Sequence, residues 1–220
     1  MIIAEIGSVH DGSLGNAKNL IDLAAECGAD CVKFQTHIAN AESLPNAPNP
    51  TYFKDETRLD YFNRTSFTLQ EWMELKDRAE SNKILFISSP FSLEAVDLLE
   101  QIDMVTYKIP SGEVTNLPLL HKIADIGKPV LLSSGMSNWN ELDTAVNILN
   151  KNDLVVMQCS SIYPCPPENV GLNILSEMKE RYDCQIGFSD HTNGFSASIS
   201  AAVLGATVIE KHFTFSKKMY

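Results

Sequence analysis

The chain alternates between short apolar runs and longer segments in which apolar residues recur every three or four positions. The short runs are rich in Val, Ile, Leu and Phe, as buried strands of parallel sheets are, and the longer segments have the period of amphipathic helices. The predicted strands are residues 2–6, 31–35, 84–89, 104–109, 129–134, 154–161, 185–191 and 207–215, and the helical segments are 16–29, 68–82, 93–102, 116–127, 140–152 and 194–206. Strands alternating with helices in this way predict an α/β fold, a (β/α)8 TIM barrel.

Polar side chains stand at or just after the ends of these apolar runs. They are Glu5, Lys33, Gln35, Ser88, Ser89, Lys108, Ser111, Glu113, Ser133, Ser134, Ser160, Ser161, Tyr163, His191 and His212. In a barrel of this type the carboxyl ends of all strands lie on one face, and active sites are built there. We therefore expect these side chains to meet in one site.

Two of the predicted strands end on a histidine, His191 and His212, and Glu210 alternates with His212 along one face of the last strand. Two imidazoles on one rim are how a metal site is built on a barrel. The alternative is that each histidine only caps its strand by hydrogen bonding. The residues alone leave both interpretations open.

The positions of the glycines between the predicted elements fit the barrel. Gly28, Gly127 and Gly205 each follow a helical segment and precede a strand, where a left-handed helix cap is expected. The exception is residues 37–67, a stretch too long for an ordinary connection. Its prolines and aromatics, among them Tyr52, Phe53, Tyr61 and Phe62, indicate either a lid over the rim or a packed surface excursion.

With 220 residues and 44% hydrophobic content, the chain is expected to form one domain, slightly short of a typical complete barrel. No helical pattern follows the last strand, so we expect the barrel domain, residues 1–220, to be C-terminally incomplete or that strand to be covered by something else. A net charge of −11 argues against nucleic acid as a partner. Neither a membrane-spanning run nor a signal peptide is visible, which predicts a cytoplasmic protein.

The five cysteines include no CxxC pair and are expected to be mostly buried thiols. Cys159 ends a strand near the expected site, but its position does not make it a strong candidate for a nucleophile. No glycine-rich nucleotide loop is present. Lysines and hydroxyls suit phosphate and carboxylate oxygens, and a metal held by imidazoles suits polarisation of a carbonyl. The set predicts a small anionic substrate meeting a metal-activated electrophile; a Schiff base on a lysine is the alternative, which leaves the two histidines without a role.

Eight segments of the chain, in order, resemble the sialic acid synthase family, which includes N-acetylneuraminate synthase and the legionaminic and pseudaminic acid synthases. They are AEIG, VKFQT, SSPFS, YKIPSGE, LLSSGM, SSIYPCPPE, GFSDHT and ATVIEKHFT, around Glu5, Lys33, Ser89, Lys108, Ser134, Tyr163, His191 and His212. The resemblance implies the same barrel and a transferase that forms a carbon–carbon bond. It would condense phosphoenolpyruvate with N-acetylmannosamine or a related N-acetylated hexose aldehyde, with water and a divalent metal, to a nine-carbon 2-keto acid and phosphate.

The resemblance also implies roles for individual residues. His191 and His212 would bind the metal, with Mn²⁺ the first candidate and Mg²⁺ or Co²⁺ as alternatives. The phosphoenolpyruvate cradle would be formed by Lys33, Lys108, Ser89, Ser111, Ser134, Ser161 and Ser189. Gln35, Glu113 and Tyr163 would line the reacting carbons or the sugar. Glu5 would transfer a proton or position water.

Some residues depart from the family pattern. Val9-His10-Asp11-Gly12 stands where many members read NHNG, Ser89 where threonine is common, and Ser161 where asparagine is frequent. The acceptor sugar therefore stays open. Members usually continue into an eighth helix and a small antifreeze-like domain, absent from this sequence, and we expect a homodimer for a full-length protein. Two other interpretations are kept: a metal-dependent aldolase on the same barrel, and a non-catalytic or truncated family member.

Overall fold

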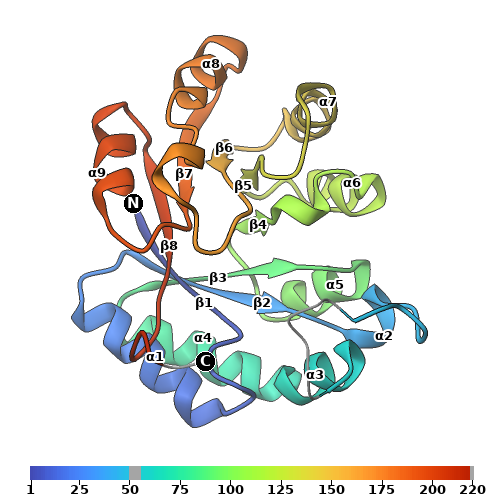
Figure 1. Cartoon of the computed structure of the whole chain (residues 1–220). Coiled ribbons are helices and arrows are strands. Elements are labelled where there is room, and N and C mark those ends of the chain that lie inside the picture. Colours follow the sequence, from blue (N-terminus) through green and yellow to red (C-terminus); the bar gives the residue numbers. More distant parts are fainter. Residues whose placement is uncertain (50–55, 219–220) are drawn as a thin grey trace.

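The computed structural model describes residues 1–49 and 56–218 and is a closed barrel of parallel strands (Figure 1). The strands are β1 (Ile2–Gly7), β2 (Cys31–Thr36), β3 (Leu85–Pro90), β4 (Tyr107–Ile109), β5 (Val130–Ser133), β6 (Leu154–Cys159), β7 (Gln185–Asp190) and β8 (Val208–His212). Each strand pairs with the next, and β8 closes the barrel on β1. The predicted TIM barrel is confirmed.

Helices surround the barrel on the outside (Figure 1). They are α1 (Leu14–Glu26), α2 (Ala39–Glu42), α3 (Arg58–Thr65), α4 (Leu69–Ser81), α5 (Leu93–Gln101), α6 (Leu117–Ile126), α7 (Trp139–Leu149), α8 (Ile174–Arg181) and α9 (Ser196–Val203), with short 3-10 helices η1 (Ser111–Glu113) and η2 (Pro167–Asn169). Side-chain caps fix several starts: Thr68 and Glu71 form a capping box at α4, as Asn138 and Glu141 do at α7. Gly28, Gly127 and Gly205 all adopt positive φ after a helix, as predicted.

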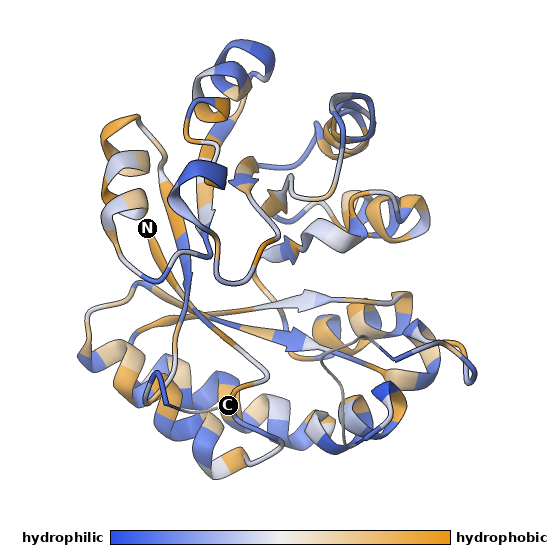
Figure 2. Cartoon of the chain, in the orientation of Figure 1, coloured by the Kyte–Doolittle hydropathy of each residue, from blue (hydrophilic) through white to orange (hydrophobic). Residues whose placement is uncertain are grey.

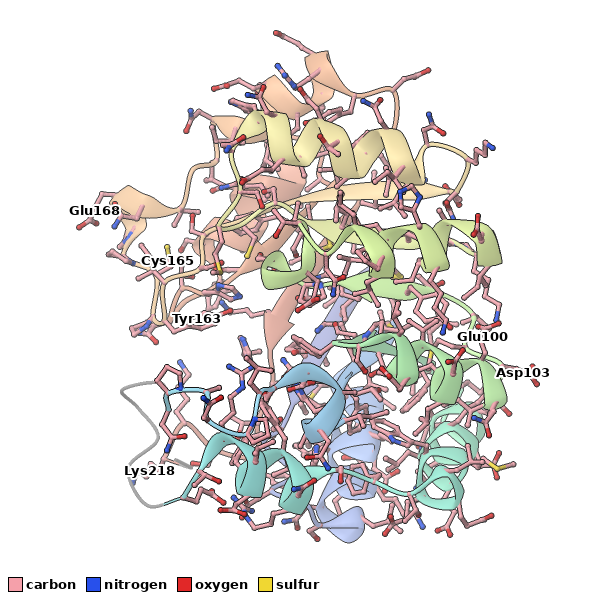
Figure 3. All side chains as sticks on the ribbon, turned by 90° about the vertical axis from the view of Figure 1, so that its right-hand side faces the viewer. Glu100, Asp103, Tyr163, Cys165, Glu168 and Lys218 are labelled. Atoms are coloured by element: carbon pink, nitrogen blue, oxygen red, sulfur yellow. The ribbon has the colours of Figure 1, made fainter. Side chains whose placement is uncertain are left out.

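The main core lies between the strands and the inner sides of the helices. Figure 2 shows apolar residues along the strands and alternating apolar and polar positions on the helices. Fully buried side chains such as Phe34, Tyr107 and Phe188 fill this layer. Polar and charged residues are also buried, however, and many of them, such as Ser89, Ser133 and Ser189, lie near the carboxyl ends of the strands. Figure 3 shows that Tyr163 and Glu168 lie at one end of the molecule and Glu100 and Asp103 at the other.

Several elements differ from the prediction. The last strand, expected over 207–215, is paired only from Val208 to His212. The strand expected over 104–109 is paired only from Tyr107 to Ile109, because the turn after α5 is followed by an irregular segment, residues 104–106. Helix α8 had no predicted counterpart; only Leu175 and Met178 are buried in its two turns, so its apolar period is short. Residues 37–67 contain α2 and α3, so their described part is not a plain loop.

The described part of residues 37–67 is packed rather than free. Phe62 of α3 is buried, and its ring stacks on that of His37. Arg64 forms ion pairs with Glu56 and with Asp11 in the loop after β1. Tyr52 and Phe53 lie outside the described residues. Asp11, one of the departures from the family pattern, therefore helps to fix α3 against the barrel.

Gly12 should tolerate no side chain, since its φ is +77° and a Cβ would collide with the backbone carbonyl oxygen of Arg64. We expect Gly12→Ala to lower the free energy of unfolding by about 3 kcal/mol or more. Gly28→Ala is the matched control, because its φ is +81° and its Cβ would meet nothing within 4 Å. The control should cost only the left-handed backbone, about 1–2 kcal/mol. Urea unfolding measures both, and equal losses would show that the contact with α3 is unimportant.

Within residues 1–49 and 56–218, no helix combines the length and apolar character needed to cross a bilayer. The five cysteines are all unpaired thiols, and Cys31, Cys159 and Cys165 are buried. The described residues that follow β8, up to Lys218, form no helix.

Candidate active site

A cavity of about 870 Å³ opens at the carboxyl end of the barrel. It is lined by Glu5, Lys33, Gln35, His37, Arg58, Phe62, Phe91, Lys108, Pro110, Ser111, Gly112, Ser133, Met136, Cys159, Ser161, Tyr163, Ser189, His191, Glu210 and His212. Ten of the predicted site residues are in this set: Glu5, Lys33, Gln35, Lys108, Ser111, Ser161, Tyr163, Ser189, His191 and His212. The strand ends thus meet where the barrel pattern predicted.

The floor of the cavity is a buried network of two lysines and two glutamates. Lys33 Nζ lies 2.7 Å from Glu5 Oε2 and 3.9 Å from Glu210 Oε2, and Lys108 Nζ lies 3.5 Å from Glu210 Oε1. All four residues are at most 5% exposed. Ser189 donates a hydrogen bond to Glu210. Buried charges are tolerated when they are paired in this way, and the network has no net charge before an anion binds.

The two lysines have different electrostatic environments. Burial disfavours the ammonium of Lys33, but the carboxylates of Glu210 and Glu5 outweigh it and hold the pKa of Lys33 above its usual value. At Lys108 burial dominates, and its pKa lies below the usual value although Glu210 opposes the shift. Burial would raise the pKa of Glu210, but Lys108 and Lys33 together lower it. Glu210 therefore stays ionised, and Lys108 is the lysine whose charged form is less favoured.

Three serines at the strand ends differ in their contacts, and two of them touch a lysine. Lys108 donates to the Ser133 hydroxyl at 2.7 Å, and Ser133 lines the cavity. Ser134, the next residue, donates to Gln158 and lines a separate hollow near the start of α7. Ser89 is buried behind the cavity, where it accepts a hydrogen bond from Lys33.

The loops after β4, β5 and β6 bring two hydroxyls together over a glycine. A Cβ on Gly135 would lie 2.5 Å from Ser161 Oγ, 2.6 Å from Ser111 Oγ and 3.1 Å from the carbonyl oxygen of Cys159. Only a residue without a side chain fits between these groups. Because Ser111 and Ser161 line the cavity that contains both lysines, this arrangement is suited to the oxygens of an anion.

His191 and His212 stand together in the same cavity, with ring centroids 5.5 Å apart. Nδ1 of His191 donates to the carbonyl oxygen of Ser160, so its Nε2 lone pair remains available. Burial lowers the pKa of His191, which favours the neutral imidazole that metals require. The Tyr163 ring lies 4.0 Å from that of His191 and 5.7 Å from that of His212.

These two imidazoles fit a divalent ion as part of a ligand set. In the described ranges, no three His, Cys, Asp or Glu side chains are grouped so as to hold an ion by themselves. Glu210 Oε2 is buried without a hydrogen-bond partner in the same cavity. A metal bound here would therefore complete its coordination with water or substrate oxygens, as an open catalytic site does.

Two residues that were predicted to line the site, Gln35 and Glu113, lie on the side of the cavity next to α3. Gln35 donates from Nε2 to Glu5 Oε1 at 2.8 Å. Glu113 of η1 does not line the cavity; it accepts a hydrogen bond from Asn116, and burial raises its pKa. His37, Glu42 and Arg58 are close enough to act on that pKa. Glu113 thus lies behind the rim, next to a cluster of charged groups.

Several cavity residues were given no role in the sequence prediction. Ser133 was expected among the strand-end side chains and Glu210 was noted beside His212; both carry a usable signal, because they alternate with Leu131 and with His212 along their strands. His37 also follows Gln35 by two positions. Arg58 and Phe62 come from α3 across a long connection. Phe62 is one of the aromatics for which a position over the rim was one of two expectations, whereas no local pattern indicates that Arg58 reaches the cavity.

Known proteins are similar to this chain in both sequence and fold. The model of the NeuB family matches residues 20–220. The N,N'-diacetyllegionaminic acid synthase of Campylobacter jejuni is 42% identical over 229 residues, covering 100% of this chain and 69% of the relative. The human N-acetylneuraminate-9-phosphate synthase is 36% identical, covering 98% of this chain and 62% of the relative. The chain thus spans between 62% and 69% of the length of these two curated relatives.

Solved structures agree with these matches. The N-acetylneuraminic acid synthetase of Leptospira borgpetersenii superposes with a TM-score of 0.88 at 32% identity, covering 98% of this chain and 73% of that one. A truncated 3-deoxy-D-arabino-heptulosonate 7-phosphate synthase of Thermotoga maritima, at 14% identity and a TM-score of 0.70, shares the fold alone. The chain belongs to the NeuB family.

Proposed function

We propose that the cavity condenses phosphoenolpyruvate with an N-acetylated hexose aldehyde and water to give a nine-carbon 2-keto acid and phosphate. The observation that carries this proposal is that Lys33 and Lys108, both buried, open on the same cavity as His191 and His212. An anion site and an electrophile site therefore share one enclosed volume. Membership of the NeuB family supports the same reaction class.

Each group would have a distinct task. Lys33, Lys108 and the hydroxyls at the Gly135 loop would bind the phosphate and carboxylate of phosphoenolpyruvate. Bond formation joins C3 of the enol to the aldehyde carbon, and the aldehyde oxygen takes up a proton. Water adds to C2, and the C2–O bond to phosphate breaks. Glu5 would position that water or accept its proton, since its carboxylate lies among the cavity residues beside Lys33.

His191 and His212 would hold a divalent metal, with Mn²⁺ the first candidate and Mg²⁺ or Co²⁺ as alternatives. When bound, it would supply Lewis-acid polarisation of the aldehyde oxygen. The Tyr163 ring lies next to both imidazole rings and would line the space for the reacting carbons or the sugar. Gln35 would contact the acceptor sugar, and Glu113 would support that side of the rim. A homodimer and a cytoplasmic location stay predictions.

Gly135→Ala tests the anion cradle. The added methyl group would occupy the space between the Ser111 and Ser161 hydroxyls and force them apart. We expect the KM for phosphoenolpyruvate to rise about 10-fold or more, the value of one charge-assisted hydrogen bond, with little change in the KM for the sugar. Steady-state kinetics with each substrate varied in turn measures both, and equal changes would place the cradle elsewhere.

The reaction itself is tested by incubating the purified protein with Mn²⁺, phosphoenolpyruvate and a panel of N-acetylated hexoses. We expect phosphate release that requires both substrates, with a 2-keto acid formed in equal amount. Carbon–carbon bond formation with pyruvate in place of phosphoenolpyruvate, and without phosphate release, would instead identify an aldolase. Phosphate release without sugar would contradict the condensation.

A further inference from the structure

Beside the charged floor of the cavity, His37 connects β2 to the helices of residues 37–67. Its ring is packed between two aromatic rings, those of Phe62 and Phe91, with centroids 3.9 and 4.1 Å away and planes within 21° of parallel. Nδ1 lies 2.9 Å from both carboxylate oxygens of Glu42. Nε2 lies 3.2 Å from Gln35 Oε1. Both ring nitrogens of His37 therefore face an oxygen atom.

The donors and acceptors in this chain of contacts do not balance with a neutral imidazole. The Gln35 amide donates from Nε2 to Glu5, so its oxygen is turned toward His37. A neutral imidazole has one N–H, and one of its two contacts would then join two acceptors. Reversing the Gln35 amide only moves the conflict to Glu5. The series of contacts Glu42–His37–Gln35–Glu5 can therefore be satisfied only if it holds one proton more than a neutral His37 and two ionised carboxylates would carry.

The neighbouring charges decide where this proton resides. Glu5 lies 2.7 Å from the ammonium of Lys33, and Glu42 lies 4.0 Å from the guanidinium of Arg58, so each carboxylate has a cation that favours its ionised form. His37 instead has two aromatic faces, which stabilise a cation. Glu113 of η1 lies close to this cluster; burial raises its pKa, and a positive charge on His37 would favour its ionised form. With His37 charged, two cations balance the two carboxylates of Glu42 and Glu113.

We propose that His37 is an imidazolium and acts as a positioning residue: it fixes the orientation of the Gln35 amide and, through it, the carboxylate of Glu5. The effect on turnover rests on the proposed function, in which Gln35 and Glu5 act on the substrates. The protonation of His37 is independent of that function. Loss of the imidazolium frees the Gln35 amide to turn its oxygen toward Glu5.

The protonation state is measured directly on the protein labelled with ¹⁵N-histidine, without substrates. We expect both ring nitrogens of His37 to show the chemical shift of protonated nitrogen at pH 7.5, with the signals assigned by their loss in His37→Phe. Glu42→Gln should convert them to one protonated and one bare nitrogen, because it removes the counter-charge. A neutral ring in the parent protein would overturn the proposal.

Turnover is tested with the double variant His37→Phe/Glu42→Leu. It keeps an aromatic ring between Phe62 and Phe91 and removes the cation and its counter-ion together, so that no charge is left buried and unpaired. We expect kcat to fall about 10- to 100-fold, the usual effect of removing a group that orients a reacting residue, with the KM for phosphoenolpyruvate little changed. His37→Gln, which retains a donor for Gln35, should recover part of kcat. His121→Phe, at an exposed position of α6, is the control.

Parental kcat in a double variant that melts at the parental temperature would overturn the positioning role. If the parent protein releases no phosphate from phosphoenolpyruvate, the proposed function fails, and the nitrogen spectra still decide the state of His37.

Discussion

Replacing both His191 and His212 with alanine is expected to remove the bound divalent metal and to abolish metal-dependent condensation. The two rings share one side of the cavity, and the hydrogen bond from His191 to Ser160 leaves Nε2 as the coordinating atom. The described residues offer no third ligand of comparable kind nearby, so no substitute set remains after both changes. Metal content after equilibration with Mn²⁺ and gel filtration measures the loss independently of activity.

The fold should survive this double replacement, because His212 is exposed and His191 is half-buried. Changes at such positions typically alter the free energy of unfolding by about 0.5 kcal/mol. His121→Ala is the matched control and should retain the parental metal content. A double variant that still binds one equivalent of Mn²⁺ would refute the assignment of these histidines as ligands.

The barrel could be predicted from sequence because its strands are buried on both faces. Such strands appear as continuous apolar runs, and a charged or polar residue within them is conspicuous. Lys33 and Lys108 stand out for this reason, and both lie in the buried network. The ends of the strands were predicted less well, since pairing at β4 depends on its neighbours rather than on the apolar run itself.

The side chains that point into the cavity follow the strand period of two, which an apolar run alone does not reveal. Ser133 and Ser134 are adjacent, and only the parity of the strand decides which of them faces Lys108. A count from Leu131, two residues earlier, would have favoured Ser133. Glu210, two residues before His212, carries the same signal.

The α3 side of the cavity could not be predicted by such a count. Arg58 and Phe62 reach the rim because α3 is fixed by contacts far apart in the sequence, such as Arg64 with Asp11. Their position depends on tertiary packing, which no local period encodes. The same holds for the stacking of Phe62 and Phe91 on His37, on which the charge of that ring depends.

Lys108→Met is expected to weaken phosphoenolpyruvate binding about 10- to 100-fold while leaving sugar binding nearly unchanged. The ammonium is buried, donates to Ser133 and faces the cavity, so an anion bound there loses a charge-assisted partner. The change also leaves Glu210 paired with Lys33 alone, at 3.9 Å, and breaking a buried pair costs about 3–5 kcal/mol of stability. Isothermal titration calorimetry with each substrate separately measures the two affinities.

A weaker affinity for phosphoenolpyruvate could come from the lost cation or from the distortion caused by an unpaired Glu210. The variant Lys108→Met/Glu210→Gln separates these causes, because it removes the charge of both partners together. If the cation itself binds the anion, the double variant stays weak for phosphoenolpyruvate although its stability recovers. Lys151→Met, at an exposed position before β6, should behave as the parent. Equal losses of affinity for sugar and phosphoenolpyruvate in Lys108→Met would mean that the lysine supports the barrel and does not bind the anion.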